Sequence, residues 1–212
     1  MEKLISIKQG PIAIEGMLKI PSQATGLVLF AHGSGSSRFS PRNNFVANIL
    51  NENGLATLLI DLLSHQEDEV YQTRFDIDLL AERLNSVVEW LQKHADTKDL
   101  AIGLFGASTG AAATLQVAAA RGADIKAVVS RGGRPDLAMP YLDQVVAPTL
   151  LIVGGNDFEV IKLNKAAYDR LVCTKKIEIV PHATHLFEEP GCLDAAAALA
   201  NNWFKTYFTL VA

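Results

Sequence analysis

The chain has 212 residues, of which 49% are hydrophobic and 20% are charged, and these proportions predict one domain, residues 1–212, with a sizeable core. Its 19 basic and 23 acidic residues give a net charge of -4 and are dispersed along the chain, which argues against a nucleic-acid-binding protein. No apolar run approaches membrane-spanning length and the first residues lack a secretory signal pattern, so we expect a cytoplasmic protein without a membrane partner. The oligomeric state is not readable from these features.

Residues 4–20 alternate between apolar and polar side chains around Gly10-Pro11, which predicts two antiparallel strands at one edge of a sheet. The pattern then changes to continuous apolar runs, which are typical of parallel strands covered on both faces. These runs lie at 27–31, 56–60, 100–105, 127–129 and 149–153, and a last strand is expected at 177–180.

Helical segments are expected between these strands, at 41–51, 75–94, 107–120, 160–171 and 193–208. Strands that alternate with helices predict an α/β fold with a doubly wound sheet. We therefore expect eight strands, mostly parallel, with helices on both faces of the sheet.

The segment Gly106-Ala107-Ser108-Thr109-Gly110 follows an apolar strand and opens an alanine-rich helix. In a G-x-S-x-G turn the serine sits at a strained strand-to-helix junction, and glycines are required beside it because a Cβ would clash. The N-terminus of the following helix presents unpaired amides and the positive end of the helix dipole. The segment therefore predicts a nucleophilic serine for acyl transfer.

Other polar residues follow strands whose carboxyl ends should meet at the same rim of the sheet. Asp157 follows the strand that ends near residue 153, and His185 follows the strand that ends near residue 180. The order Ser108, Asp157, His185 is the chain order of the α/β-hydrolase triad. The glycine-serine loop that begins at His32 follows the strand 27–31, where a second oxyanion donor is needed, and His32 is expected to fix this loop.

The chain resembles the α/β-hydrolases, and more narrowly the small, lidless dienelactone hydrolase-like group. The resemblance rests on the segments His32-Gly33-Ser34-Gly35, Gly103 to Gly110, Gly154-Gly155-Asn156-Asp157 and Ala183-Thr184-His185-Leu186-Phe187. It extends from about residue 10 to the last helix. Dienelactone hydrolases proper carry a cysteine nucleophile, whereas this chain has Ser108. The segment 130–143, where many α/β-hydrolases insert a lid, is short here, so no cap domain is expected.

The expected catalytic residues are Ser108 as nucleophile, His185 as general base and Asp157 as the carboxylate that orients the imidazole. The resemblance selects His185 over the neighbouring His182. The oxyanion donors are expected to be the backbone N–H of Thr109 and one from Ser34 or Gly33, with Ser34 preferred. No metal or cofactor is required.

Three alternatives concern individual residues. Asp157 can be read as an ordinary turn residue, and Asp61 also ends a strand, although it precedes the serine and a structural or pocket-lining role is favoured for it. His182, His185 and Asp157 can be read as metal ligands, but no further strong ligand is evident.

Four arginines, Arg38, Arg42, Arg131 and Arg134, fall in or near loops on the predicted active rim. A guanidinium there can hold a substrate carboxylate, or it can solvate a loop and pair with Glu188 or Glu189. Both roles stay open for Arg38 and Arg131, whereas loop pairing is favoured for Arg42 and Arg134. Gly33 is a further candidate for substrate binding, because its loop borders the predicted site.

The sequence thus predicts a serine hydrolase that cleaves a small carboxylic ester or lactone through an acyl-enzyme. One alternative keeps the triad but acts on a thioester, amide or peracid. Another is a catalytically silent ligand-binding protein on the same fold.

Overall fold

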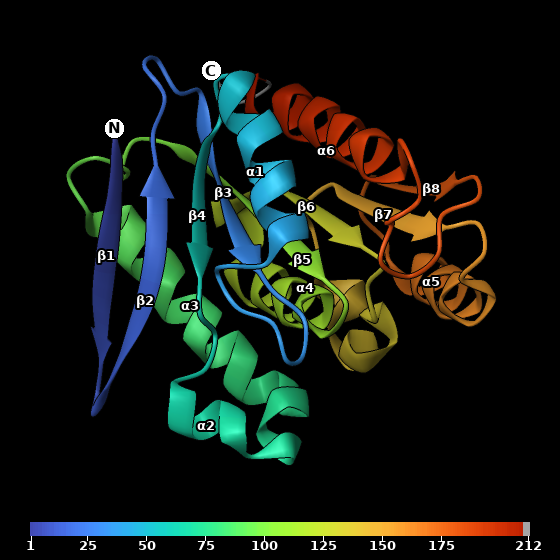
Figure 1. The fold of residues 1–212 in the computed structure, drawn as a ribbon, viewed down its shortest axis with the longest axis horizontal. Helices are drawn as coiled ribbons and strands as arrows, with labels where there is room; N and C mark the ends of the chain where they lie inside the picture. Colours follow the sequence, from blue (N-terminus) through green and yellow to red (C-terminus); the bar gives the residue numbers. More distant parts are fainter. Residues whose placement is uncertain (210–212) are drawn as a thin grey trace.

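The computed structural model describes residues 1–209, which form one eight-stranded sheet with the strand order β1-β2-β4-β3-β5-β6-β7-β8 (Figure 1). β1 pairs with β2 and β2 with β4 in antiparallel fashion, and every pairing from β4 to β8 is parallel. The strands are β1 (Glu2–Gln9), β2 (Ile12–Lys19), β3 (Gly26–Ala31), β4 (Ala56–Ile60), β5 (Ala101–Ala107), β6 (Ile125–Arg131), β7 (Thr149–Gly154) and β8 (Lys175–Val180).

Six α-helices connect the strands or follow them within the described residues. They are α1 (Pro41–Glu52), α2 (His65–Glu69), α3 (Ile77–Lys93), α4 (Thr109–Arg121), α5 (Phe158–Arg170) and α6 (Cys192–Thr209). Short 3-10 helices cover Tyr71–Phe75, Gly122–Asp124 and Pro135–Gln144. No helix within residues 1–209 combines the length and the apolar character needed to cross a membrane.

The sheet separates two hydrophobic cores. Helices α1 and α6 lie together on one face of the sheet (Figure 1). Their buried side chains, such as Val46 and Phe204, belong to one hydrophobic cluster with Phe30 and Phe105 of the sheet. Helices α3, α4 and α5 supply the core of the other face. Strands β3, β4 and β7 are buried along their whole length, as continuous apolar strands between two helical layers should be.

These features confirm the expected α/β-hydrolase fold, including the antiparallel strands at one edge and the mostly parallel eight-stranded sheet. Within residues 1–209 no cap domain is inserted, because the connection from β6 to β7 holds only the 3-10 helix Pro135–Gln144. Helix α2 is a structural addition that the apolar pattern did not predict. Its five residues are polar, and it is fixed instead by a capping box between Ser64 and Glu67.

Candidate active site

Ser108 lies between β5 and α4 in a conformation that few non-glycine residues adopt. Its φ is 50° and its ψ is -123°, so the turn is strained and the side chain is held out of the sheet. A Cβ at Gly106 would collide with the backbone of Ala111, and one at Gly110 would collide with the carbonyl oxygen of Ala31. Both glycines of the motif are therefore required by close backbone packing.

A carboxylate and an imidazole meet next to this turn. His185 Nδ1 lies 2.7 Å from Asp157 Oδ2, although the residues are 28 positions apart. Asp157 is the N-cap residue of α5, and His185 belongs to the loop between β8 and α6. The Asp157 side chain is 14% exposed and the His185 side chain 40% exposed, so the carboxylate is shielded while the imidazole reaches the surface.

Ser108 and His185 both line a cavity of about 230 Å³. Among the described residues, no hydrogen bond joins the Ser108 hydroxyl to the His185 imidazole. The two side chains are related by the cavity that both of them line. The other lining residues come from the loop after β3, the start of α1, the ends of β5 and β6, and the loop that carries His185. They are Gly33, Ser34, Ser36, Ser40, Arg42, Asn43, Ala107, Arg131, Gly132 and Leu186.

The loop after β3 approaches the serine closely. A Cβ at Gly33 would lie 2.9 Å from the Ser108 Cβ, so only glycine allows this approach without a shift. The Ser34 N–H donates a hydrogen bond of 2.9 Å to the Thr109 hydroxyl. The two residues expected to supply oxyanion donors are therefore side by side, and the Ser34 amide already has a partner.

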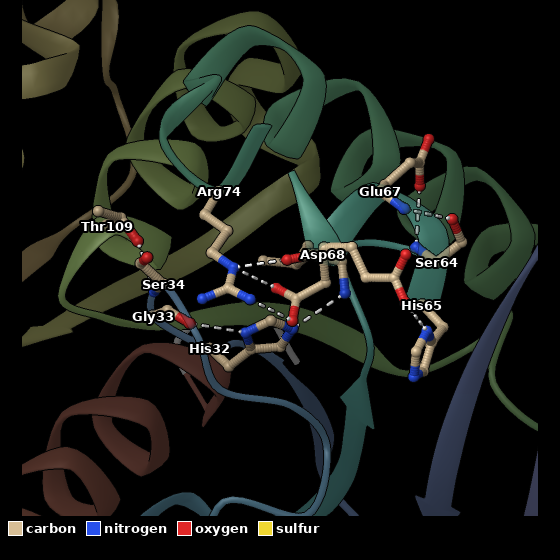
Figure 2. Close-up of polar contacts among 11 residues, drawn as sticks. His32, Gly33, Ser34, Ser64, His65, Glu67, Asp68, Arg74 and Thr109 are labelled. Atoms are coloured by element: carbon tan, nitrogen blue, oxygen red, sulfur yellow. Dashed lines mark hydrogen bonds and ion pairs between the residues drawn. The ribbon is translucent and has the colours of Figure 1, made fainter. Parts of the chain in front are cut away.

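His32 holds this loop to the next one. Its Nε2 accepts a hydrogen bond from the Leu62 N–H at 3.0 Å, so its Nδ1 carries the proton and donates to the Gly33 carbonyl at 2.9 Å (Figure 2). Burial lowers the pKa of the His32 imidazole below its ordinary value, which keeps the ring neutral. These contacts confirm that His32 fixes the loop.

The four rim arginines differ in their partners. Arg38 pairs with both Asp61 and Glu15, which leaves its guanidinium occupied by carboxylates rather than open to a substrate. Arg42 pairs with Glu188 at 2.7 Å and Arg134 with Asp136 at 2.8 Å. Arg131 differs from these three in having no carboxylate partner among residues 1–209.

Asp61 lines a second cavity, of about 450 Å³, which is also bordered by the loop that follows β3. Its carboxylate accepts hydrogen bonds from the Arg38 backbone and guanidinium, as expected for a structural, pocket-lining residue. Within the described residues, no group of three or more His, Cys, Asp and Glu side chains is placed to hold a metal ion, so His182, His185 and Asp157 do not form one.

Two residues that line the cavity of Ser108 and His185, Ser40 and Asn43, were not identified from the sequence. They lie at the N-terminus of α1, which begins at Pro41 and points this end at the cavity. The serine-proline pair marks a helix start in the sequence, but only the packing of α1 against the sheet shows where that start points.

Comparison with known proteins places these features in context. The model of the dienelactone hydrolase family matches residues 14–211. A solved dienelactone hydrolase from Anabaena variabilis is 54% identical, with 98% of each chain covered and a TM-score of 0.95. An esterase from Pyrococcus furiosus, 17% identical over 98% of this chain and 92% of its own, superposes with a TM-score of 0.82 and shares the fold.

Two Mycobacterium tuberculosis proteins, both named "Putative phosphoribosyl transferase", are 52% identical over 200 residues. The match covers 94% of this chain but 45% of each of those proteins, so the chain spans less than half of their length.

Proposed function

This chain belongs to the dienelactone hydrolase family, and from that premise we propose that it is a serine hydrolase that cleaves small carboxylic esters or lactones through an acyl-enzyme intermediate. The observation that carries the proposal is the strained turn at Ser108, which faces the same cavity as an imidazole hydrogen-bonded to a carboxylate. A hydroxyl needs such a base to become a nucleophile at neutral pH.

In the proposed mechanism Asp157 accepts the Nδ1–H of His185, which leaves Nε2 free to take a proton. The Ser108 Oγ attacks the substrate carbonyl carbon as its proton passes to His185. The carbonyl oxygen becomes an oxyanion that the N–H groups of Thr109 and Ser34 stabilise. When the intermediate collapses, the protonated imidazole gives its proton to the leaving alcohol and an acyl-Ser108 ester remains.

Water completes the reaction by attacking the acyl-enzyme with His185 again as the base, which releases the carboxylic acid and restores the Ser108 hydroxyl. The mechanism needs no metal and no cofactor. The substrate is a small molecule, because the cavity of about 230 Å³ is smaller than the ~300–1,000 Å³ typical of sites for drug-sized ligands.

The transferase name of the mycobacterial relatives refers to proteins of which more than half lies outside the match. We assign no phosphoribosyl transfer to this chain, because the cavity features on which the proposal rests are those of acyl transfer.

A leaving-group series tests the proposal. We expect turnover of ethyl butyrate and p-nitrophenyl acetate to exceed turnover of butyryl thioester, butyryl anilide and the perhydrolysis of acetate by hydrogen peroxide. A thioester, amide or peracid preference would keep the triad and change the reaction. No turnover of any of these compounds would favour a silent ligand-binding protein.

A further inference from the structure

Arg131 is a buried positive charge at the wall of the catalytic cavity. It is the last residue of β6, it is 5% exposed, and it lines the cavity that contains Ser108 and His185. Within the sheet it lies opposite Ala107, the residue before Ser108, and its carbonyl accepts a long hydrogen bond of 3.4 Å from the Ser108 N–H. A group bound at Arg131 would therefore lie close to the reacting serine.

The buried Arg131 guanidinium has few hydrogen-bond partners and no opposite charge beside it within the described residues. Its Nη2 donates one long hydrogen bond of 3.4 Å to Asn43 Oδ1, and its carbon lies 5.5 Å from the centre of the Phe187 ring. Within the part of the chain that the structure describes, its buried Nε has no hydrogen-bond partner. A buried charge in this condition is costly unless an opposite charge pairs with it.

The surroundings of Arg131 add positive rather than negative potential. Burial, together with the nearby Arg42, lowers the pKa of Arg131 to about 10, so it remains charged at neutral pH. The N-terminus of α1 also faces the cavity, and its first turn has no acidic residue. Glu188 pairs with Arg42, but the Glu188 side chain is 62% exposed and its charge is screened by solvent.

Arg38 provides a comparison within the same molecule. Its side chain is also well buried, at 13% exposed, and it lines the neighbouring cavity. Unlike Arg131, it pairs with two carboxylates, those of Asp61 and Glu15. The buried Nε of Arg38 also has no hydrogen-bond partner among the described residues, so the difference lies in charge: two carboxylates neutralise Arg38, whereas none pairs with Arg131 within residues 1–209.

We propose that Arg131, with Arg42, Asn43 and the N-terminus of α1, forms an anion subsite beside Ser108, so that the enzyme prefers esters that carry a carboxylate or phosphate over neutral esters. This inference rests on the proposed function for its consequence in catalysis, but anion binding at Arg131 does not require turnover. The planar guanidinium suits both anions, because each presents paired oxygens to its N–H groups.

The first test measures binding without catalysis. Thermal midpoints of Ser108→Ala would be recorded while inorganic phosphate or succinate is titrated at constant ionic strength. We expect a saturable rise in the midpoint with at least one of these anions, and the effective anion identifies the ligand as phosphate or carboxylate. The rise should be absent in Ser108→Ala/Arg131→Met and retained in Ser108→Ala/Arg134→Met, which changes an arginine of the same loop outside the cavity lining.

Methionine has a volume similar to that of arginine, and replacing an uncompensated buried charge with it is expected to preserve folding, which far-UV circular dichroism would check. If Arg131→Met does not fold, Arg131→Lys replaces it, because the ammonium lacks the paired N–H groups and should weaken binding. Equal responses with and without Arg131, or no saturable response to either anion, would overturn the subsite.

The second test measures specificity as kcat/KM for monoethyl succinate, ethyl 3-phosphonopropionate and ethyl butyrate. We expect Arg131→Met to lower the ratio of the preferred anionic ester to the neutral ester by about 10–100-fold, the worth of a charged hydrogen bond, and Arg134→Met to leave it unchanged. An unchanged ratio in Arg131→Met would overturn the preference. If the wild type hydrolyses none of these esters, the proposed function fails, while the binding test still decides whether the subsite exists.

Discussion

The Thr109 hydroxyl accepts a 2.9 Å hydrogen bond from the Ser34 backbone N–H, which joins two segments that are 75 positions apart. Thr109 directly follows Ser108 in the G-x-S-x-G turn, and Ser34 belongs to the loop that follows β3. Their amides are the two donors assigned to the oxyanion in the proposed mechanism. The hydrogen bond holds the Ser34 amide beside the turn that carries Ser108. In the proposed mechanism the oxyanion would replace the Thr109 hydroxyl as the partner of this amide.

This contact predicts how Thr109 variants behave. Thr109→Ser keeps the hydroxyl and should retain kcat, whereas Thr109→Val leaves the Ser34 amide unheld and should lower kcat by about 10–100-fold with little change in KM. Steady-state kinetics on a neutral ester would measure both constants. Equal losses in the serine and valine variants, or a change in KM alone, would contradict the positioning role.

We expect the change to asparagine to lower kcat much more at Asp157 than at Asp61. Asp157→Asn should lower kcat by roughly 10⁴-fold, because an amide favours the wrong tautomer of His185. Asp61→Asn should change kcat far less, since its carboxylate binds Arg38 in the neighbouring cavity. Measuring kcat for the two variants, with circular dichroism to confirm folding, checks that Asp157 rather than Asp61 is the carboxylate that orients His185. A larger loss from Asp61→Asn would reverse this assignment.

Gly110 is expected to be essential for folding, because a Cβ there would collide with the backbone carbonyl of Ala31. Gly110→Ala should therefore be insoluble or unfold at much lower urea concentration. Gly54→Ala is the matched control. Its φ is 83° but no atom lies within 4 Å of the added Cβ, so a loss of about 1 kcal/mol is expected. Similar urea midpoints for the two variants would contradict the steric argument.

The burial of His32 should make the free energy of unfolding depend on pH. Its pKa in the folded protein is lowered by burial, so the unfolded chain binds a proton more readily. The contribution of His32 is present above the unfolded pKa, near 6.5, and is lost as the pH falls from there toward the lower folded value. Urea unfolding between pH 8 and 5 should show a steeper loss for the wild type than for His32→Asn. Parallel curves would mean that His32 titrates normally.

The fold and the G-x-S-x-G turn at Ser108 could be predicted because each depends on a local sequence pattern. Continuous apolar runs identify strands that are buried on both faces, and glycines flanking Ser108 identify a turn that excludes a Cβ. The same pattern placed Asp157 and the His182–His185 segment at one rim, because polar residues after parallel strands gather there, and the family resemblance then selected His185 over His182.

The environment of Arg131 could not be predicted in the same way. The sequence indicates only that Arg38 and Arg131 fall in or near loops on the predicted rim. The structure shows that carboxylates pair with Arg38 and that none pairs with Arg131 within residues 1–209. Asn43 and Ser40 were missed for a related reason, since the direction of α1 depends on its packing against the sheet. Helix α2 was missed because its polar residues carry no apolar periodicity.

The central claim is that Ser108 is an activated nucleophile, and covalent labelling with a small fluorophosphonate tests it most directly. The Ser108 Oγ attacks phosphorus and fluoride leaves, so intact-mass spectrometry detects a stable adduct. The account predicts one adduct per chain in the wild type, together with loss of p-nitrophenyl acetate turnover, and no adduct in Ser108→Ala. An unlabelled wild type, or equal labelling of the two proteins, would contradict it.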